Sequence, residues 1–296
     1  MPINNDAALG TASYIELLDL AEMSTQVDAL VTEVVSSALS VDLLRQALAT
    51  GINDLAALLR AVPVAEGRLL ERGIGFVARR NPDLVILTDN LRLPVTKAAS
   101  ELVAMNDPAL VKSLSLDADH GGRKSYTPDL LILNKVTKVA HLVDVKRSLG
   151  SYEVSRITEL KQRMLAAALV VPDLLFKEHR RLHVEEVRVV ILNAENQRTD
   201  IGGGVWPLTH LDHLVEITGA GRLMEHLRKR FQAEVEANWS VALRGHGPHA
   251  DNACSSRIAE PETGFRPPSQ KSEEQSPTDR VPVSIGFART PRMAGA

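Results

Sequence analysis

Two short apolar segments separated by a turn constrain the fold of this chain more than any other feature. The first is Thr127-Pro128-Asp129-Leu130-Leu131-Ile132-Leu133, and the second is Val139-Ala140-His141-Leu142-Val143-Asp144-Val145-Lys146. Both are typical of buried strands, and their spacing suits a hairpin. Side chains two residues apart in a strand point to the same face of a sheet, so we expect Asp144 and Lys146 to project together. Pairing of the two strands would bring Asp129 beside them.

Two carboxylates and an ammonium on one sheet face suit Mg²⁺-assisted phosphodiester cleavage. Carboxylate oxygens hold the hard cation, and the lysine orients or activates the attacking water. Asp144 is the most informative of the three, because a charge inside an apolar strand is costly to bury unless it is paired or bound to a metal. Each residue also has a simpler interpretation. Asp129 could cap a turn, Asp144 could face solvent on an edge strand, and Lys146 could form an ion pair with Asp144.

Pro128-Asp129, followed fifteen residues after that acid by Asp144-Val145-Lys146, resembles the PD-(D/E)XK nuclease superfamily, which includes restriction endonucleases, recombination nucleases and junction resolvases. The resemblance covers roughly residues 90–195. Periodicity in this region independently predicts the order helix, three strands, helix, strand, over residues 95–105, 110–116, 129–133, 139–146, 152–171 and 187–192. The fold class expected is α/β, with a restriction endonuclease-like α-β-β-β-α-β core in which helices flank a mixed sheet.

The resemblance also implies roles for particular residues. Asp129 and Asp144 would hold Mg²⁺, or Mn²⁺ in its place, and Lys146 would act on the water or on the developing charge. The family often adds a glutamate from the first core helix; Glu101 is the best placed by chain order, and Glu71 in the preceding helix is its competitor. Residues on the following helix resemble polar or basic groups beside the metal site, and nearby arginines are candidates for phosphate contacts. These nucleic-acid-binding candidates are Arg147, Arg156, Lys161, Gln162 and Arg163.

Composition shifts along the chain predict three parts. Residues 1–62 form an acidic helical module, with apolar residues at helical spacing and eight acidic residues against two basic ones over the first 60. Residues 63–244 form the nuclease-like core, and residues 245–296, rich in Pro, Ser, Gly and charge, form a disordered tail. Within the core, Asn81-Pro82-Asp83-Leu84-Val85-Ile86-Leu87 repeats the pattern of the first strand; we interpret it as a strand opened by turn chemistry rather than a second site.

The charge distribution favours one kind of ligand, and the composition excludes several kinds of site. The net charge is −3, yet residues 120–190 hold thirteen basic residues against eight acidic ones, which favours phosphate binding near the predicted site. The single cysteine, Cys254, excludes a disulfide framework and a cysteine-rich zinc site. Aromatic residues make up 3%, which argues against extended base-stacking platforms. No apolar run is long enough for a membrane span and no leader is visible, so we expect a cytoplasmic protein without a membrane role.

The function predicted from the sequence is metal-dependent cleavage of DNA, with endonucleolytic action. The main alternative is a nuclease fold that has lost catalysis and serves as a DNA- or protein-binding regulatory module. A third reading takes the triplet as coincidence in another kind of α/β enzyme. The N-terminal helices could form a homodimer, or their apolar stripe could pack on the core, and the sequence leaves both open.

Overall fold

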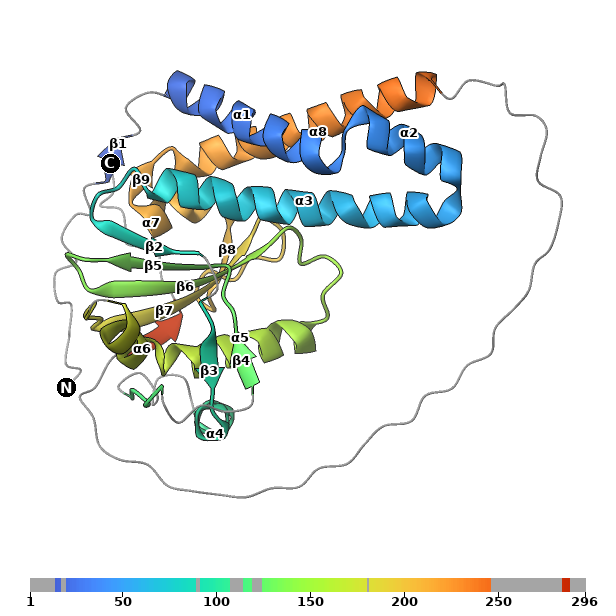
Figure 1. Cartoon of the computed structure of the whole chain (residues 1–296). Coiled ribbons are helices and arrows are strands. Elements are labelled where there is room, and N and C mark those ends of the chain that lie inside the picture. Colours follow the sequence, from blue (N-terminus) through green and yellow to red (C-terminus); the bar gives the residue numbers. More distant parts are fainter. Residues whose placement is uncertain are drawn as a thin grey trace, which may run out of the picture.

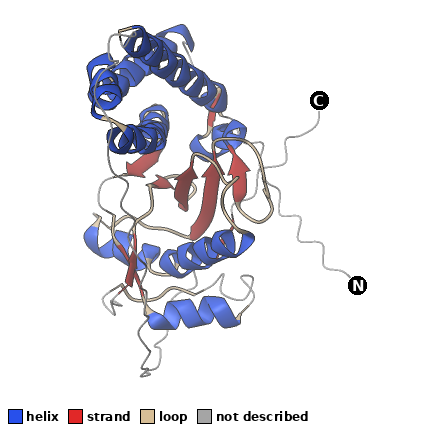
Figure 2. Cartoon of the chain, turned by 90° about the vertical axis from the view of Figure 1, so that its right-hand side faces the viewer, coloured by secondary structure: helices blue, strands red, loops and turns tan. Residues whose placement is uncertain are grey.

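The computed structural model describes residues 14–16, 20–88, 91–106, 114–118, 124–179, 181–245 and 284–287. It is an α/β protein in which helices cover both faces of a mixed sheet (Figures 1 and 2). The long helices at the top of Figure 1 cover one face, and shorter helices at the bottom cover the other. Two clusters of buried apolar side chains, one on each side of the sheet, hold these layers together.

The central sheet has six strands within the described residues. They are β2 (Leu84–Leu87), β5 (Leu130–Asn134), β6 (Val139–Lys146), β7 (Glu186–Asn193), β8 (Val205–Pro207) and β10 (Ser284–Phe287). β2, β5 and β6 are successive antiparallel neighbours, whereas β7 runs parallel to β6. β10 and β8 pair in parallel with the first and second halves of the far edge of β7. β5 and β6 are interior strands covered on both faces, which explains their nearly continuous apolar sequences.

The two strands predicted from the sequence are β5 and β6, and they form the expected hairpin. Asn134 makes the turn between them, because its side-chain oxygen accepts the backbone N–H groups of Val136 and Thr137 at 2.8 and 3.0 Å. Such a local side-chain bond is a common way of fixing a turn. Lys138 then takes a left-handed φ of 58° before β6 begins. This tight turn sets the register of the hairpin.

Four helices build the upper layer: α1 (Leu20–Ala38), α2 (Val41–Thr50), α3 (Ile52–Ala78) and α8 (Ala220–Arg244). α1 buries the apolar stripe predicted from its sequence, and the hydroxyl of Ser40 caps α2 by accepting the N–H of Leu43. α1 packs on α3 and α8. The boundary predicted between residues 62 and 63 lies inside α3, which continues to Ala78. The N-terminal helices therefore share one apolar cluster with the sheet.

The lower layer holds α4 (Lys97–Met105), α5 (Val154–Ala168), α6 (Val171–Glu178) and a ribbon of two antiparallel strands, β3 (Leu93–Val95) and β4 (Lys124–Tyr126). α4 and α5 correspond to the helices predicted over 95–105 and 152–171, although the second ends at Ala168 and α6 follows it. The strand predicted over 110–116 is wrong for residues 114–116, which are not in a strand, and residues 110–113 lie outside the described residues. β2 takes the sheet position beside β5 instead.

The remaining described elements lie between β8 and α8, and one of them pairs with a short strand that precedes α1. A short 3-10 helix, η1 (Leu208–His210), leads into α7 (Leu211–Val215) and β9 (Ile217–Thr218), which pairs with β1 (Ile15–Glu16). Gly219, with φ 88°, directly precedes α8. The predicted disorder of residues 245–296 is wrong for 284–287, because these residues form β10 on the edge of β7; residues 246–283 and 288–296 lie outside the described residues. No described helix has the length and apolarity needed to cross a membrane.

Candidate active site at the open end of the hairpin

Asp129 and Asp144 lie opposite each other at the open end of the β5–β6 hairpin. Leu130 pairs with Val143, so extending this register by one residue sets the two aspartates side by side. One carboxylate oxygen of Asp129 accepts the backbone N–H of Val145 at 2.6 Å, which ties the start of β5 to the end of β6. The hairpin therefore brings the two predicted acids together across adjacent strands.

Asp144 is buried, with 4% of its surface exposed, and its Oδ1 accepts no hydrogen bond from the described residues. Oδ1 forms an ion pair with Lys146, as the shared strand face predicts. Oδ2 accepts a 2.8 Å hydrogen bond from the hydroxyl of Tyr126, which comes from β4. Tyr126 is not among the site residues predicted from the sequence, although it lies three residues before Asp129 and so enters the site on the same segment. These contacts explain how a carboxylate is accommodated within an apolar strand.

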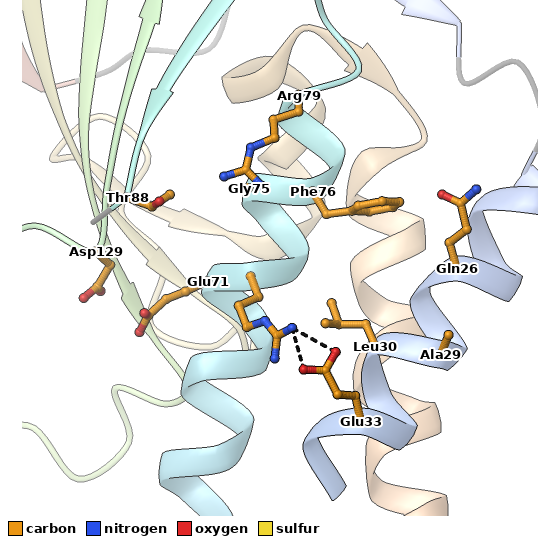
Figure 3. A pocket seen from close by; sticks show the side chains of 11 residues that line it. Gln26, Ala29, Leu30, Glu33, Glu71, Gly75, Phe76, Arg79, Thr88 and Asp129 are labelled. Carbon is orange, nitrogen blue, oxygen red and sulfur yellow. Dashed lines mark hydrogen bonds and ion pairs between the residues drawn. The ribbon is translucent and has the colours of Figure 1, made fainter. Parts of the chain in front are cut away.

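Glu71, on α3, completes the cluster. Figure 3 shows the side chain of Glu71 extending from α3 toward Asp129 at the end of the sheet. Burial raises the pKa of Glu71 from 4.5 to about 7, with further contributions from the nearby charges of Asp129 and Asp144, while Lys146 opposes the shift. The third acid near the predicted pair is therefore Glu71, the competitor in the sequence analysis.

Glu101, the preferred third acid in the sequence analysis, does not join this cluster. It lies on the exposed surface of α4, where it forms an ion pair with Lys97 one helical turn away at 3.6 Å. Its assignment is corrected by the packing of the helices: α3 passes the open end of the hairpin and carries Glu71 there, whereas α4 packs against α5. Helix order along the chain alone does not reveal which helix reaches the site.

The protonation of the other groups follows from their surroundings. Burial and the neighbouring charge of Asp144 raise the pKa of Asp129 from 3.8 to about 6, against the hydrogen bond from Val145 and the charge of Lys146. For Lys146, burial acts to lower the pKa, but Asp144 and Asp129 outweigh it and the pKa is raised. Burial, followed by Asp144, also raises the pKa of Tyr126. Lys146 is therefore a cation and Tyr126 a neutral hydrogen-bond donor at neutral pH.

The cluster has the right donor chemistry for a divalent cation but not a complete ligand set. Carboxylate oxygens are the ligands that Mg²⁺ prefers, and repulsion between Glu71 and Asp129 is relieved when a cation binds between them. However, no group of three or more His, Cys, Asp or Glu side chains in the described part of the chain is gathered closely enough to hold a metal ion. Asp144 is turned to Tyr126 and Lys146, which leaves Asp129 and Glu71 as the neighbouring pair of acids.

The structure separates the predicted nucleic-acid contacts into two groups. Arg147 forms ion pairs with Glu195 and with the buried Glu66, at 3.4 and 3.9 Å, and Lys161 pairs with Asp200 at 3.3 Å. Arg156, Gln162 and Arg163 lie exposed on α5, and Arg163 is near enough to Tyr126 to interact electrostatically with it. The exposed group is free to meet a ligand at the surface, whereas Arg147 and Lys161 are engaged within the protein.

A groove of about 560 Å³ leads from this cluster across α3 to α1. Asp129, Glu71 and Thr88 line one end, and Gln26, Ala29 and Glu33 of α1 line the other (Figure 3). Nothing in the sequence pattern pointed to this groove, because it depends on the packing of α1 beside α3.

The comparisons with known proteins add no relative. No family model matches the chain, and searches of curated proteins and of solved structures give no match. What the structure defines is an α/β protein with a mixed sheet between helices. Any assignment of function therefore depends on the geometry of the site.

Proposed function

We propose that this protein is a metal-dependent DNA nuclease of the PD-(D/E)XK type, which hydrolyses phosphodiester bonds endonucleolytically. The observation that carries the proposal is the convergence at the open end of the hairpin. Asp129 lies opposite Asp144, Lys146 is paired with Asp144, and Glu71 faces Asp129 from α3.

The order of the elements supports the same class. Counted from the helix that carries Glu71, the chain runs α3, β2, β5, β6, α5, β7, with the β3–α4–β4 segment between β2 and β5 and α6 between α5 and β7. With these inserted elements left out, the order is compatible with the α-β-β-β-α-β order that the resemblance implies. The pairing, antiparallel from β2 to β6 and then parallel to β7, gives a mixed sheet with helices on both faces. The first core helix is then α3, not the helix over residues 95–105.

Each side chain has a distinct role in this proposal. Asp129 and Glu71 would hold Mg²⁺ or Mn²⁺, which supplies Lewis-acid charge and a more acidic bound water, and Asp144 would hold Lys146 beside them. Because the pKa of Lys146 is raised, its ammonium would stabilise negative charge on the phosphate rather than remove a proton. Tyr126 would hold Asp144 in place through its hydroxyl. Arg156, Gln162 and Arg163 on α5 would contact the DNA backbone beside the site.

Cleavage assays test the proposal directly. Supercoiled plasmid and single-stranded DNA are incubated with the protein in Mg²⁺, in Mn²⁺ or in EDTA. We expect cleavage with either metal, none in EDTA, and none with Lys146→Ala. Lys97→Ala is the matched control, because Lys97 also forms an ion pair with an acid on its own element but lies on α4, away from the site. Equal activity of Lys146→Ala and wild type would reject the site.

One observation favours a second candidate, a nuclease fold that binds DNA without cutting it. Both oxygens of Asp144 are already engaged by Tyr126 and Lys146, and no three-acid group is gathered in the described residues. Under this alternative, neither metal supports cleavage, while wild type and Lys146→Ala retain DNA equally and release it as salt rises.

A further inference from the structure

Apart from Asp129 and Glu71, the residues that line the groove across α3 have no part in the chemistry proposed above. The groove volume of about 560 Å³ falls inside the range of roughly 300–1,000 Å³ that small-molecule sites occupy. One end opens directly on Asp129 and Glu71 (Figure 3). A ligand in the groove would therefore extend from the candidate site along the surface of α3 toward α1.

The cations in the groove are not equivalent. Arg72 is held by Glu33 of α1, with one guanidinium nitrogen 3.0 Å from each carboxylate oxygen. Arg79 directly follows the last residue of α3, and its side chain makes no hydrogen bond or ion pair with any other residue that the structure describes. Because the charge of Arg72 is already compensated, Arg79 is the cation in the groove that can meet an anionic group such as a phosphate.

Between the two arginines, Phe76 provides an apolar surface. Gly75 beside it is buried, and a Cβ atom there would make ordinary van der Waals contacts with Thr88 Cγ2 at 3.7 Å and Leu130 Cδ2 at 4.0 Å. The ring of Phe76 lines the groove while packing partly against the core, and Arg80 lies 5.6 Å from its centre. An aromatic ring of this kind stacks with a nucleic-acid base whatever its sequence. A single ring suits one base, in keeping with the low aromatic content of the chain.

We propose that this groove binds one unpaired nucleotide of the DNA, with its base at Phe76 and a phosphate at Arg79. This inference rests on the proposed function and names its substrate class: DNA that is single-stranded or locally unpaired next to the cleaved bond. A paired base must first unstack and unpair to enter such a groove, at a cost in free energy that an already unpaired base avoids. The groove therefore favours flaps, gaps and single strands over intact duplex.

Binding measurements in EDTA test the groove without cleavage. The probes are a fluorescent single-stranded oligonucleotide and the duplex of the same sequence, followed by anisotropy at low salt. For Phe76→Ala and Arg79→Ala we expect single-strand affinity to fall by about tenfold or more, with little change in duplex affinity. The controls are Phe176→Ala, an aromatic residue 51% exposed on α6, and Arg60→Ala, an exposed arginine on α3 outside the groove. Equal losses for both probes, or none for either, would overturn the proposal.

Two further comparisons keep a folding defect apart from a binding defect. Phe76→Leu preserves most of the apolar volume but not the aromatic face, so it should bind single strands as weakly as Phe76→Ala while melting close to wild type. Arg79→Ala removes an exposed side chain and should leave the Tm unchanged. The proposed function is judged separately by metal-dependent cleavage. If wild type cleaves DNA but the variants show no selective loss of single-strand affinity, only the groove proposal is rejected. If the variants lose single-strand affinity selectively but wild type does not cleave, only the nuclease proposal is rejected.

Discussion

Two neighbouring strands of the sheet begin with nearly the same sequence, yet only one of them contributes to the candidate site. Asn81-Pro82-Asp83 opens β2, and Thr127-Pro128-Asp129 opens β5. Because β2 and β5 are antiparallel, with Leu84 paired with Asn134, the two aspartates lie at opposite ends of the sheet. Asp129 reaches Asp144, Lys146 and Glu71, whereas Asp83 is exposed at the other end.

The end of the sheet near Asp83 is organised by a buried amide rather than by a cluster of acids. The side-chain oxygen of Asn81 accepts the N–H of Asp83 at 3.0 Å, and its amide group donates to the carbonyl of Val215 at 3.1 Å. The Pro-Asp pair therefore serves as a turn in one copy and as part of the candidate site in the other. The comparison shows that the pairing direction of the strand decides whether a Pro-Asp motif lies at the candidate site or at the opposite end of the sheet.

The largest expected effect separates the two aspartates. Asp129→Asn should lower the rate of metal-dependent plasmid cleavage by about 100-fold or more, because it removes a charge from the centre of the cluster. Asp83→Asn preserves the turn and should cleave at the wild-type rate. Initial rates of plasmid nicking at matched protein concentration measure both. Equal losses in the two variants would show that Pro-Asp is structural in both copies.

A second comparison concerns the two glutamates that competed for the third acid. Glu71→Gln should reduce cleavage by about tenfold to 100-fold, since the residue faces Asp129 and would help hold the cation. Glu101→Gln removes an exposed ion pair with Lys97 and should leave the rate unchanged. The same nicking assay compares the two variants, both in rate and in the Mg²⁺ concentration needed for half-maximal rate. A larger loss in Glu101→Gln would reverse the assignment made from the structure.

The turn at the other end of the sheet should matter for stability and not for activity. Asn81→Ala leaves the Val215 carbonyl without its buried partner, and we expect the free energy of unfolding to fall by about 1–3 kcal/mol. Urea denaturation measures this loss. Cleavage per folded molecule should stay at the wild-type value, and a fall in activity without a fall in stability would place this end of the sheet within the site.

The smallest effect expected is a pH dependence of stability in the absence of metal. Glu71 and Asp129 have pKa values raised to about 7 and about 6 in the folded protein. The folded state therefore binds more protons than the unfolded state between these values and the ordinary values of 4.5 and 3.8. Their contribution to stability is complete at the acidic side of this window and is lost as the pH rises toward about 7.

In Glu71→Gln an uncharged amide replaces the acid, so the variant should lose much less stability than wild type as the pH rises. Thermal melting in EDTA, from pH 4.5 to 8, is compared between wild type and variant. We expect the Tm difference, variant minus wild type, to grow as the pH rises. A constant difference across the range would mean that Glu71 keeps an ordinary pKa. Mg²⁺ should stabilise wild type more at pH 8 than at pH 6, because the acids must be ionised to bind it.

Several features of the site followed from the sequence because they are local. Asp144 and Lys146 share a face through the two-residue period of a strand, as predicted, and they form the ion pair that was the simpler interpretation of Lys146. Asp129 meets Asp144 because only a short turn, closed by Asn134, separates their strands. Few arrangements satisfy such a short connection together with two buried apolar strands.

The errors in the sequence analysis concern parts that pack over long separations. Glu101 and Glu71 both lie on helices with an apolar stripe, and a stripe does not specify which sheet face or end it covers. The strand predicted over 110–116 occupies no position in the sheet for residues 114–116, and β2 lies beside β5 instead, because chain order does not specify which strands pair. β10 was missed because four residues within a polar tail become a strand only when the edge of β7 receives them.

The sequence by itself determined the hairpin, the alternation along its strands and the grouping of Asp129, Asp144 and Lys146. These depend on strand geometry and on a turn of a few residues. The tertiary structure alone decided that Glu71 lies beside Asp129 and that a groove crosses α3. It also decided that Asp83, just before β2, lies at the opposite end of the sheet. The physical reason is that apolar burial is non-directional: it drives a helix or strand onto the core, but the contacts among many distant residues settle where it lies.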